Sequence, residues 1–155
     1  MLSADNQQER LDINWLVGFV DGEGCFHISI NKMKSMKLGW QVLPEFRIVQ
    51  HERDINLLWR IKNTLGCGNV TTNHGNRKEL RVRGLENLNK IVKFFDLNKL
   101  QTKKQADFDL FRRVIVMMNE KKHLSSEGLI EIAEIASLMN RKVRRKCLES
   151  PETIR

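Results

Sequence analysis

The spacing of apolar and polar positions changes from helical to alternating along the first third of the chain. Residues 11–20 have helical spacing, with Asp12 available as an N-cap, and Gly22 and Gly24 are expected to end the helix. Residues 26–48 alternate on both sides of a polar turn. The pattern predicts a helix followed by a β-hairpin with one polar face.

The same order of elements follows a second time. Residues 54–65 are spaced as a helix that Gly66 and Gly68 terminate, and residues 69–73 and 78–83 alternate as a second hairpin. The remaining helical spacing lies in three stretches, residues 86–97, 102–122 and 125–140. This segregation predicts an α+β fold with a four-stranded antiparallel sheet backed on one face by helices.

The first helix is apolar on two sides. One side carries Leu11, Trp15, Gly18 and Phe19, and the other carries Ile13, Leu16 and Val20. One side can serve the core of this chain, so the other must meet a different surface. Glycine at position 18 permits close approach of a second helix, and a second copy of the chain could supply it.

Length and charge favour one basic domain. The chain has 155 residues with a formal net charge of +8 and a pI near 9.7, which is typical of nucleic-acid binding but also of a merely soluble surface. We expect one domain over residues 1–155, with a core over about 11–140 and a basic extension over 141–155. The sequence lacks an apolar run long enough for a membrane span and begins unlike a signal peptide, which predicts a soluble protein without a membrane partner.

Three cysteines, Cys25, Cys67 and Cys147, are odd in number and lack zinc-site spacing. This usage indicates buried thiols in a reducing compartment, such as a bacterial or archaeal cytoplasm or an organelle interior.

The polar face of the predicted sheet carries side chains that reach base edges or phosphates, although a polar solvent face is also what any antiparallel sheet can have. The candidates for DNA contact on the two hairpins are His27, Ser29, Asn31, Gln41, Leu43, Glu45, Arg47, Thr71, Asn73, His74, Lys78, Glu79, Arg81 and Arg83.

Two carboxylates, Asp21 and Glu23, lie at the end of the first helix between glycines. If two copies pack through this helix, their Glu23 side chains approach each other and repel unless divalent cations lie between them. Mg²⁺ suits such a place because it binds through one or two carboxylates plus phosphate oxygens and water. The alternative is that both acids merely end a helix in a glycine turn.

Four segments extend this motif. They are WLVGFVDGEGCFHISI at residues 15–30, PEFRIVQHERD at 44–54, GCGNV at 66–70 and TKKQADFDLF at 102–111. Together they resemble the LAGLIDADG homing endonucleases over about residues 14–140. The resemblance implies an αββαββα fold whose saddle-shaped sheet lies in the DNA major groove. A single motif implies a homodimer, with Trp15, Gly18, Phe19, Asp21 and Gly22 at the interface.

The resemblance also implies roles for individual residues. Glu23 matches the metal-binding acid, with backbone oxygens such as that of Gly22 beside it. Gln50 matches a polar residue that orients water near the scissile phosphate. The family also has a catalytic basic residue at the start of the helix that begins TKKQADF; Lys104 fits this position best and Lys103 is one place away, although Thr102 could occupy it instead. Two or three Mg²⁺ ions per dimer–DNA complex are expected, which Mn²⁺ or Ca²⁺ could replace for binding.

The expected function is that of an intron-encoded homing endonuclease. Such an enzyme makes a double-strand break in a long, pseudo-palindromic double-stranded DNA target by metal-dependent phosphodiester hydrolysis. Two alternatives remain open at this point: a splicing cofactor that binds intron RNA, and a DNA-binding protein that no longer cleaves.

Overall fold

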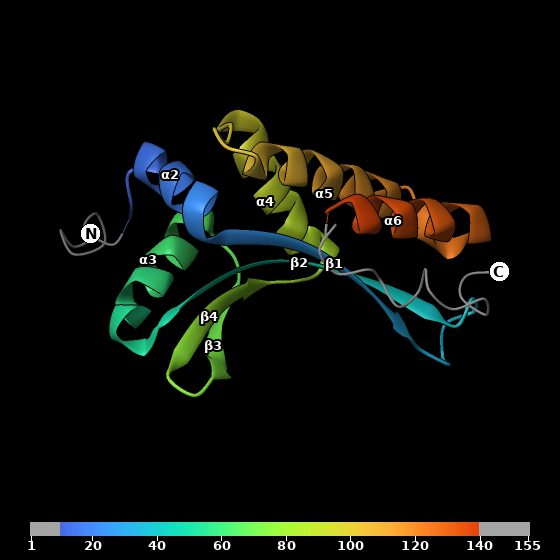
Figure 1. Cartoon of the computed structure of the whole chain (residues 1–155), viewed down its shortest axis with the longest axis horizontal. Coiled ribbons are helices and arrows are strands. Elements are labelled where there is room, and N and C mark those ends of the chain that lie inside the picture. Colours follow the sequence, from blue (N-terminus) through green and yellow to red (C-terminus); the bar gives the residue numbers. More distant parts are fainter. Residues whose placement is uncertain (1–9, 140–155) are drawn as a thin grey trace, which may run out of the picture. The chain divides into compact units, whose positions relative to one another are not determined.

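The elements follow the order that the sequence pattern predicts. The computed structural model describes residues 10–139 as helix, hairpin, helix, hairpin and helices (Figure 1). These residues form two compact units, the first with 10–25 and 45–105 and the second with 26–44 and 106–139. Cys147 and the expected basic extension at 141–155 lie outside the described residues.

One four-stranded sheet consists of β1 (Gly24–Lys32), β2 (Trp40–His51), β3 (Asn69–His74) and β4 (Arg77–Val82), in the order β1-β2-β4-β3. Both β2 and β3 pair antiparallel with β4. The register shifts between Thr72 and His74, which places a β-bulge at Asn73. The prediction of a four-stranded antiparallel sheet with helices is confirmed.

Helix α2 (Ile13–Glu23) begins as predicted but ends later. The Asp12 carboxylate accepts a hydrogen bond from the Trp15 amide and caps the first turn. Leu16 and Val20 are fully buried, whereas Ile13 is 46% exposed although we expected it on the same side. Of the two glycines expected to end the helix, Gly24 is its C-cap as predicted, whereas the helix continues through Gly22 to Glu23 and passes directly into β1.

Gly24 permits this direct transition from helix to strand. A Cβ atom at this position would lie 2.6 Å from Cγ1 and 2.9 Å from the carbonyl oxygen of Val20. Any side chain here would therefore push the end of α2 away from the start of β1. The glycine places Glu23 at the boundary between the two elements.

Two further helices complete the first unit. Helix α3 (Ile55–Leu65) follows a 3₁₀ turn at Glu52–Asp54 and ends at Gly66, whose φ of 77° is left-handed as a helix C-cap often requires. Helix α4 spans Leu85–Leu97. The rings of Phe46 from β2 and Phe95 from α4 pack 5.9 Å apart, and both side chains are fully buried.

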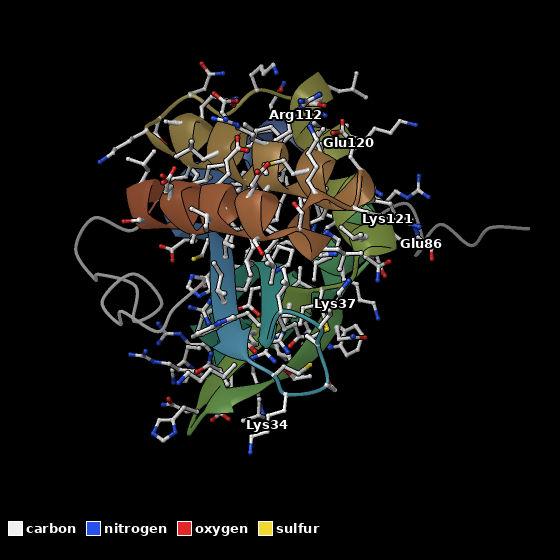
Figure 2. All side chains as sticks on the ribbon, turned by 90° about the vertical axis from the view of Figure 1, so that its right-hand side faces the viewer. Lys34, Lys37, Glu86, Arg112, Glu120 and Lys121 are labelled. Atoms are coloured by element: carbon white, nitrogen blue, oxygen red, sulfur yellow. The ribbon has the colours of Figure 1, made fainter. Side chains whose placement is uncertain are left out.

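The second unit contains residues 106–119 of α5 (Lys104–Asn119), the 3₁₀ turn Lys122–Leu124 and α6 (Ser126–Met139). The two helices lie side by side, and Figure 2 shows Lys34 and Lys37 on the connection between β1 and β2. Nη2 of Arg113 on α5 lies 2.6 Å from Oε1 of Glu131 on α6. Phe26 packs against Phe108 and Phe111, with ring centroids 5.4 and 5.3 Å away.

Candidate functional site

Glu23 presents an exposed carboxylate at the C-terminal end of α2. Its Oε2 atom accepts a long hydrogen bond of 3.4 Å from Nε2 of Gln50 on β2. The last turn of a helix also leaves main-chain carbonyl groups without helical partners, and Gly22 belongs to this turn. The structure thus gathers carboxylate, amide and carbonyl groups at one point.

Asp21, two residues before Glu23, differs from it because its carboxylate is hydrogen-bonded to another segment of the first unit. Its carboxylate accepts hydrogen bonds from the amides of Gln101 and Thr102 and from the Thr102 hydroxyl, at 2.8 to 3.1 Å. Burial alone raises the pKa of this carboxyl, but these hydrogen bonds and the nearby Lys104 outweigh it and bring the pKa below its usual value. Asp21 therefore ties the end of α2 to the loop that precedes α5.

This loop brings one of the two candidate lysines to the end of α2. Lys104 is half-buried, and its Nζ atom donates a hydrogen bond to the carbonyl oxygen of Gly24. Lys103 is exposed. Of the two, Lys104 is the lysine that contacts the residue next to Glu23. Thr102 is the other candidate for this position. Its hydroxyl donates to the Asp21 carboxylate and accepts from the backbone amide of Lys104.

Two hollows adjoin Glu23 on the first unit. One has a volume of about 450 Å³ and the other about 500 Å³, and both are lined by Glu23, Val49 and Arg77. The first is completed by Cys25, Arg47 and Asn73, and the second by Gln50, His51 and Asn76. The guanidinium and amide groups that line these hollows can donate hydrogen bonds to phosphate oxygens, so the hollows place Glu23 where a nucleic-acid backbone could bind.

Sequence reasoning missed Arg77, which lines both hollows. The predicted strand begins at Lys78 and therefore leaves out Arg77, which is the first residue of β4. In the register Arg77 lies opposite both His51 and His74. The signal that could have found it is its position directly after the Gly75–Asn76 turn of a two-residue hairpin.

Three arginines and two glutamates cluster on one face of the sheet, four of them on β2 and β4 and the fifth, Arg83, directly after β4. Arg83 Nε donates to Glu45 Oε2 at 2.8 Å, and Arg81 Nη2 lies 2.6 Å from Glu79 Oε1. Arg47 Nη1 lies 3.5 Å from Glu45 Oε1. The two acids were expected to be open to DNA, but they are only 4% and 1% exposed. The crowding of long guanidinium side chains around them explains this difference.

The other predicted DNA-contacting residues divide between the units. Those of the first unit that are exposed are Thr71, Asn73 and His74, and Lys78 is half-buried with Nζ bound to the Thr72 hydroxyl. Those of the second unit are His27, Ser29, Asn31, Gln41 and Leu43. Ser29 Oγ donates to the Leu43 carbonyl at 3.1 Å, which links β1 to β2 within that unit.

The donor chemistry at Glu23 suits a hard cation. Within residues 10–139 no cluster of three or more His, Cys, Asp or Glu side chains could hold a metal ion. The groups at the end of α2 are instead one carboxylate and the carbonyl of Gly22, and oxygen is the donor that Mg²⁺ and Ca²⁺ prefer. These residues fit such an ion, provided that its remaining ligands come from elsewhere.

Comparison with known proteins gives the family. The sequence model of a protein family described as LAGLIDADG endonuclease matches residues 16–115, which include the end of α2 with Glu23. The chain belongs to the LAGLIDADG endonuclease family. The family predicted from the sequence motifs is thereby confirmed.

Relatives and solved structures of this LAGLIDADG chain differ in length. "Probable intron-encoded endonuclease 3" of Neurospora crassa is 36% identical over 125 residues, which cover 79% of this chain but 24% of that protein. The solved homing endonuclease I-TnaI is 49% identical, with a TM-score of 0.89, and the match covers 94% of this chain and 99% of that one. The chain therefore spans about a quarter of the curated relative but nearly the full length of I-TnaI.

A further solved structure adds a ligand. I-SmaMI, bound to an uncleaved DNA target in the presence of calcium ions, is 32% identical with a TM-score of 0.84, over 86% of this chain and 46% of that one. The αββαββα order of the LAGLIDADG chain agrees with this likeness. Among its described residues, no helix combines the length and the apolar character needed to cross a membrane.

Proposed function

We propose that this chain is a homing endonuclease that makes a double-strand break in a long, nearly palindromic DNA site as a homodimer with Mg²⁺. The observation that carries the proposal is the exposed Glu23 carboxylate, which lies beside Gln50 and next to the carbonyl that Lys104 binds. A protein that only binds DNA gains nothing from an unneutralised acid facing phosphates, because the two repel.

Glu23 and the Gly22 carbonyl would hold the cation. A bound Mg²⁺ supplies Lewis-acid stabilisation of the attacked phosphate and a water of lowered pKa. No three-acid cluster exists among residues 10–139, so the missing ligands would be phosphate oxygens and the Glu23 of a second copy.

Gln50 and Lys104 would act on the reacting groups. Gln50 Nε2 reaches Glu23 only at 3.4 Å, so its amide can turn to orient a water beside the scissile phosphate. Lys104 places a cation at the same end of α2, where it can stabilise negative charge that develops on the phosphate. Lys103, which is exposed, would stay outside this site.

Helix α2 would supply the dimer interface. Trp15 is 47% exposed, and its ring stacks on that of Phe19 at 5.1 Å, so an aromatic surface lies beside exposed Gly18. One copy of this chain matches less than half of the DNA-bound I-SmaMI chain, which supports a requirement for two copies. A two-fold dimer then requires a target with related halves.

The whole chain would act as one endonuclease domain in a reducing compartment. The Cys67 thiol is buried, and burial raises its pKa, so it is inert packing rather than a reactive group. Cys25 is only half-buried, which differs from the expectation of buried thiols, and a reducing environment would keep it as a free thiol.

Cleavage of a cognate plasmid tests the proposal. The plasmid carries the joined sequence that flanks the intron around the reading frame, and it is incubated with Mg²⁺, with Ca²⁺ or with a chelator. We expect linear product with Mg²⁺ alone and binding without cleavage in Ca²⁺. Binding without cleavage in Mg²⁺ would identify a non-cleaving protein, and a gel shift with the intron RNA alone would identify a splicing cofactor.

A further inference from the structure

The arginine–glutamate cluster on the sheet, formed by Glu45, Arg47, Glu79, Arg81 and Arg83, is organised around its two acids. Their side chains are 5% and 1% exposed, whereas the three arginine side chains are 35% to 42% exposed. The acids thus lie beneath the cations. The arrangement is the reverse of a surface ion pair, in which both partners are open to water.

Each acid binds more than one partner. Glu79 accepts from Arg81 Nη2 through Oε1 at 2.6 Å and from Asn73 Nδ2 through Oε2 at 2.8 Å. Asn73 lies at the β-bulge of β3, where the extra residue changes the direction of its side chain. Glu79 therefore fixes one guanidinium and one amide from two different strands.

Glu45 holds the neighbouring part of the cluster. Its Oε2 accepts from Arg83 Nε at 2.8 Å and lies 3.8 Å from Arg81 Nε. Arg81 Nε is buried without a hydrogen-bond partner, so Glu45 attracts this side of the guanidinium by charge alone, whereas Glu79 binds Nη2 at 2.6 Å.

The strand register explains why acids are needed here. Arg47 and Arg81 are direct Cα partners across β2 and β4, and like charges opposite each other destabilise a sheet. Each of these arginines is preceded, two positions earlier and on the same face, by one of the glutamates. The acids remove the repulsion at a desolvation cost, and buried ion pairs are weak sources of stability. What the bonds chiefly provide is a defined side-chain geometry.

We propose that Glu79 and Glu45 are positioning residues that hold the arginines of the sheet in the orientation in which they read a DNA duplex. The inference rests on the proposed function of the chain. An arginine has five N–H donors, so the bond that Arg81 donates to Glu79 leaves other donors of Arg81 for a base edge or a phosphate. The partner recognised by this array is double-stranded DNA of a preferred sequence.

The two acids also limit affinity for unrelated DNA. Three guanidinium groups against two carboxylates leave the cluster with a net charge of one, so its attraction for phosphates is small. Removing one acid raises that charge and at the same time frees the arginine that it held. We therefore expect unrelated duplexes to bind as well or better, while the preferred duplex binds less well.

Glu79→Gln tests this inference in the full chain. In the wild type each oxygen of Glu79 accepts from a different partner, Arg81 or Asn73. Glutamine replaces one of these oxygens by an NH₂ group, which donates, so one of the two hydrogen bonds is lost. The probe is the duplex that the wild-type chain enriches from a randomised library in Ca²⁺, compared at one salt concentration with a scrambled duplex of equal length. We define the specificity ratio as the dissociation constant of the scrambled duplex divided by that of the preferred duplex. We expect this ratio to fall about ten- to a hundredfold in the variant, which is the range for the loss of one base contact.

Two further variants keep the test decisive. Glu134→Gln makes the same charge change at an exposed position of α6 and should leave the ratio unchanged. Glu79→Asp keeps the charge but shortens its reach, so it should lower the ratio without raising affinity for the scrambled duplex, and it replaces Glu79→Gln if that variant does not fold.

The inference is overturned if the ratio for both Glu79 variants stays at the wild-type value. It is also overturned if affinity for both duplexes falls by one common factor along with the melting temperature, since that result indicates a structural role alone. If the wild-type chain enriches no duplex, the proposed function fails together with it. If enrichment and cleavage persist while the ratio is unchanged, only the inference fails.

Discussion

The acid at the end of α2 and the acids on the sheet face belong to the same unit but meet opposite surroundings. Glu23 is exposed and receives one hydrogen bond of 3.4 Å from a neutral amide. Glu79 is 1% exposed and receives bonds of 2.6 and 2.8 Å from a guanidinium and an amide. Both oxygens of Glu79 are occupied by protein donors and the side chain is buried, so of these two acids Glu23 is the one that is open to a metal ion.

The difference shows that sequence position and charge do not define the role of an acid. Asp21 makes the same point within a single helix turn, because its carboxylate holds the loop of Gln101 and Thr102 while Glu23 stays open. What separates the three acids is the set of donors that distant segments bring to them.

Glu23→Gln tests the role of the exposed acid and is expected to have the largest effect. We expect cleavage in Mg²⁺ to slow by about a thousandfold or more, because the carboxylate that holds the cation is lost. Affinity for the preferred duplex in Ca²⁺ should change little. Single-turnover cleavage and gel shift measure the two effects.

Glu86→Gln is the matched control for this change. It lies in the first turn of α4, is exposed, and is labelled in Figure 2. Its cleavage rate should equal that of the wild type. Undiminished cutting by Glu23→Gln would contradict the assignment of this carboxylate.

The two lysines at the start of α5, Lys104 as its first residue and Lys103 directly before it, give the next largest effect. Lys104→Met removes the ammonium group that binds the Gly24 carbonyl at the end of α2. We expect cleavage to slow by about a hundredfold, which is the lower end of the range for loss of a positioned group that transfers a proton or stabilises charge. Lys103→Met removes an exposed cation and should cut at nearly the wild-type rate. The opposite ranking in a single-turnover assay would move the role to Lys103.

The smallest expected effect is that of Asp21→Asn on stability. Its hydrogen bonds are open to solvent, so we expect a loss of at most about 1 kcal/mol in the free energy of unfolding. Because the pKa of Asp21 in the folded chain lies below its usual value, its contribution is fully present above that usual value and is lost as the pH falls through the folded pKa. The free energies of unfolding of the wild type and of Asp21→Asn, measured by denaturant titration, should therefore differ at pH 7 and converge only once the pH has fallen below the folded pKa of Asp21. A gap that persists in acid would show that the charge of Asp21 is not its cause.

Local patterns predicted most of the fold. Asp12 as a cap, Gly66 as a C-cap and the two hairpins all follow from neighbouring residues, and the structure confirms them. Gly22 is the exception, because a glycine near a helix end lowers helix propensity without preventing a helix that is held by Leu16 and Val20 in the core.

The candidate site was predictable only in part. The motif resemblance named Glu23 and Gln50, which the structure brings into contact, but it left Lys103 and Lys104 unresolved. The sheet pattern named Glu45 and Glu79 as residues of a wet face, and both are buried. Alternation assigns a residue to a face of a sheet, but it does not show how many side chains cover that face.

From sequence alone, the periods of the helices and strands, the excess of positive charge and the acid-bearing glycine motif were already determined, because each depends on residues close together in the chain. Only the tertiary structure decided which acids stay exposed. Glu79 lies in a strand with neighbours on both sides, Val49 on β2 and Thr71 on β3, and its carboxylate binds Arg81 on its own strand and Asn73 on β3. The burial and partners of a carboxylate depend on such pairings, which no local pattern contains.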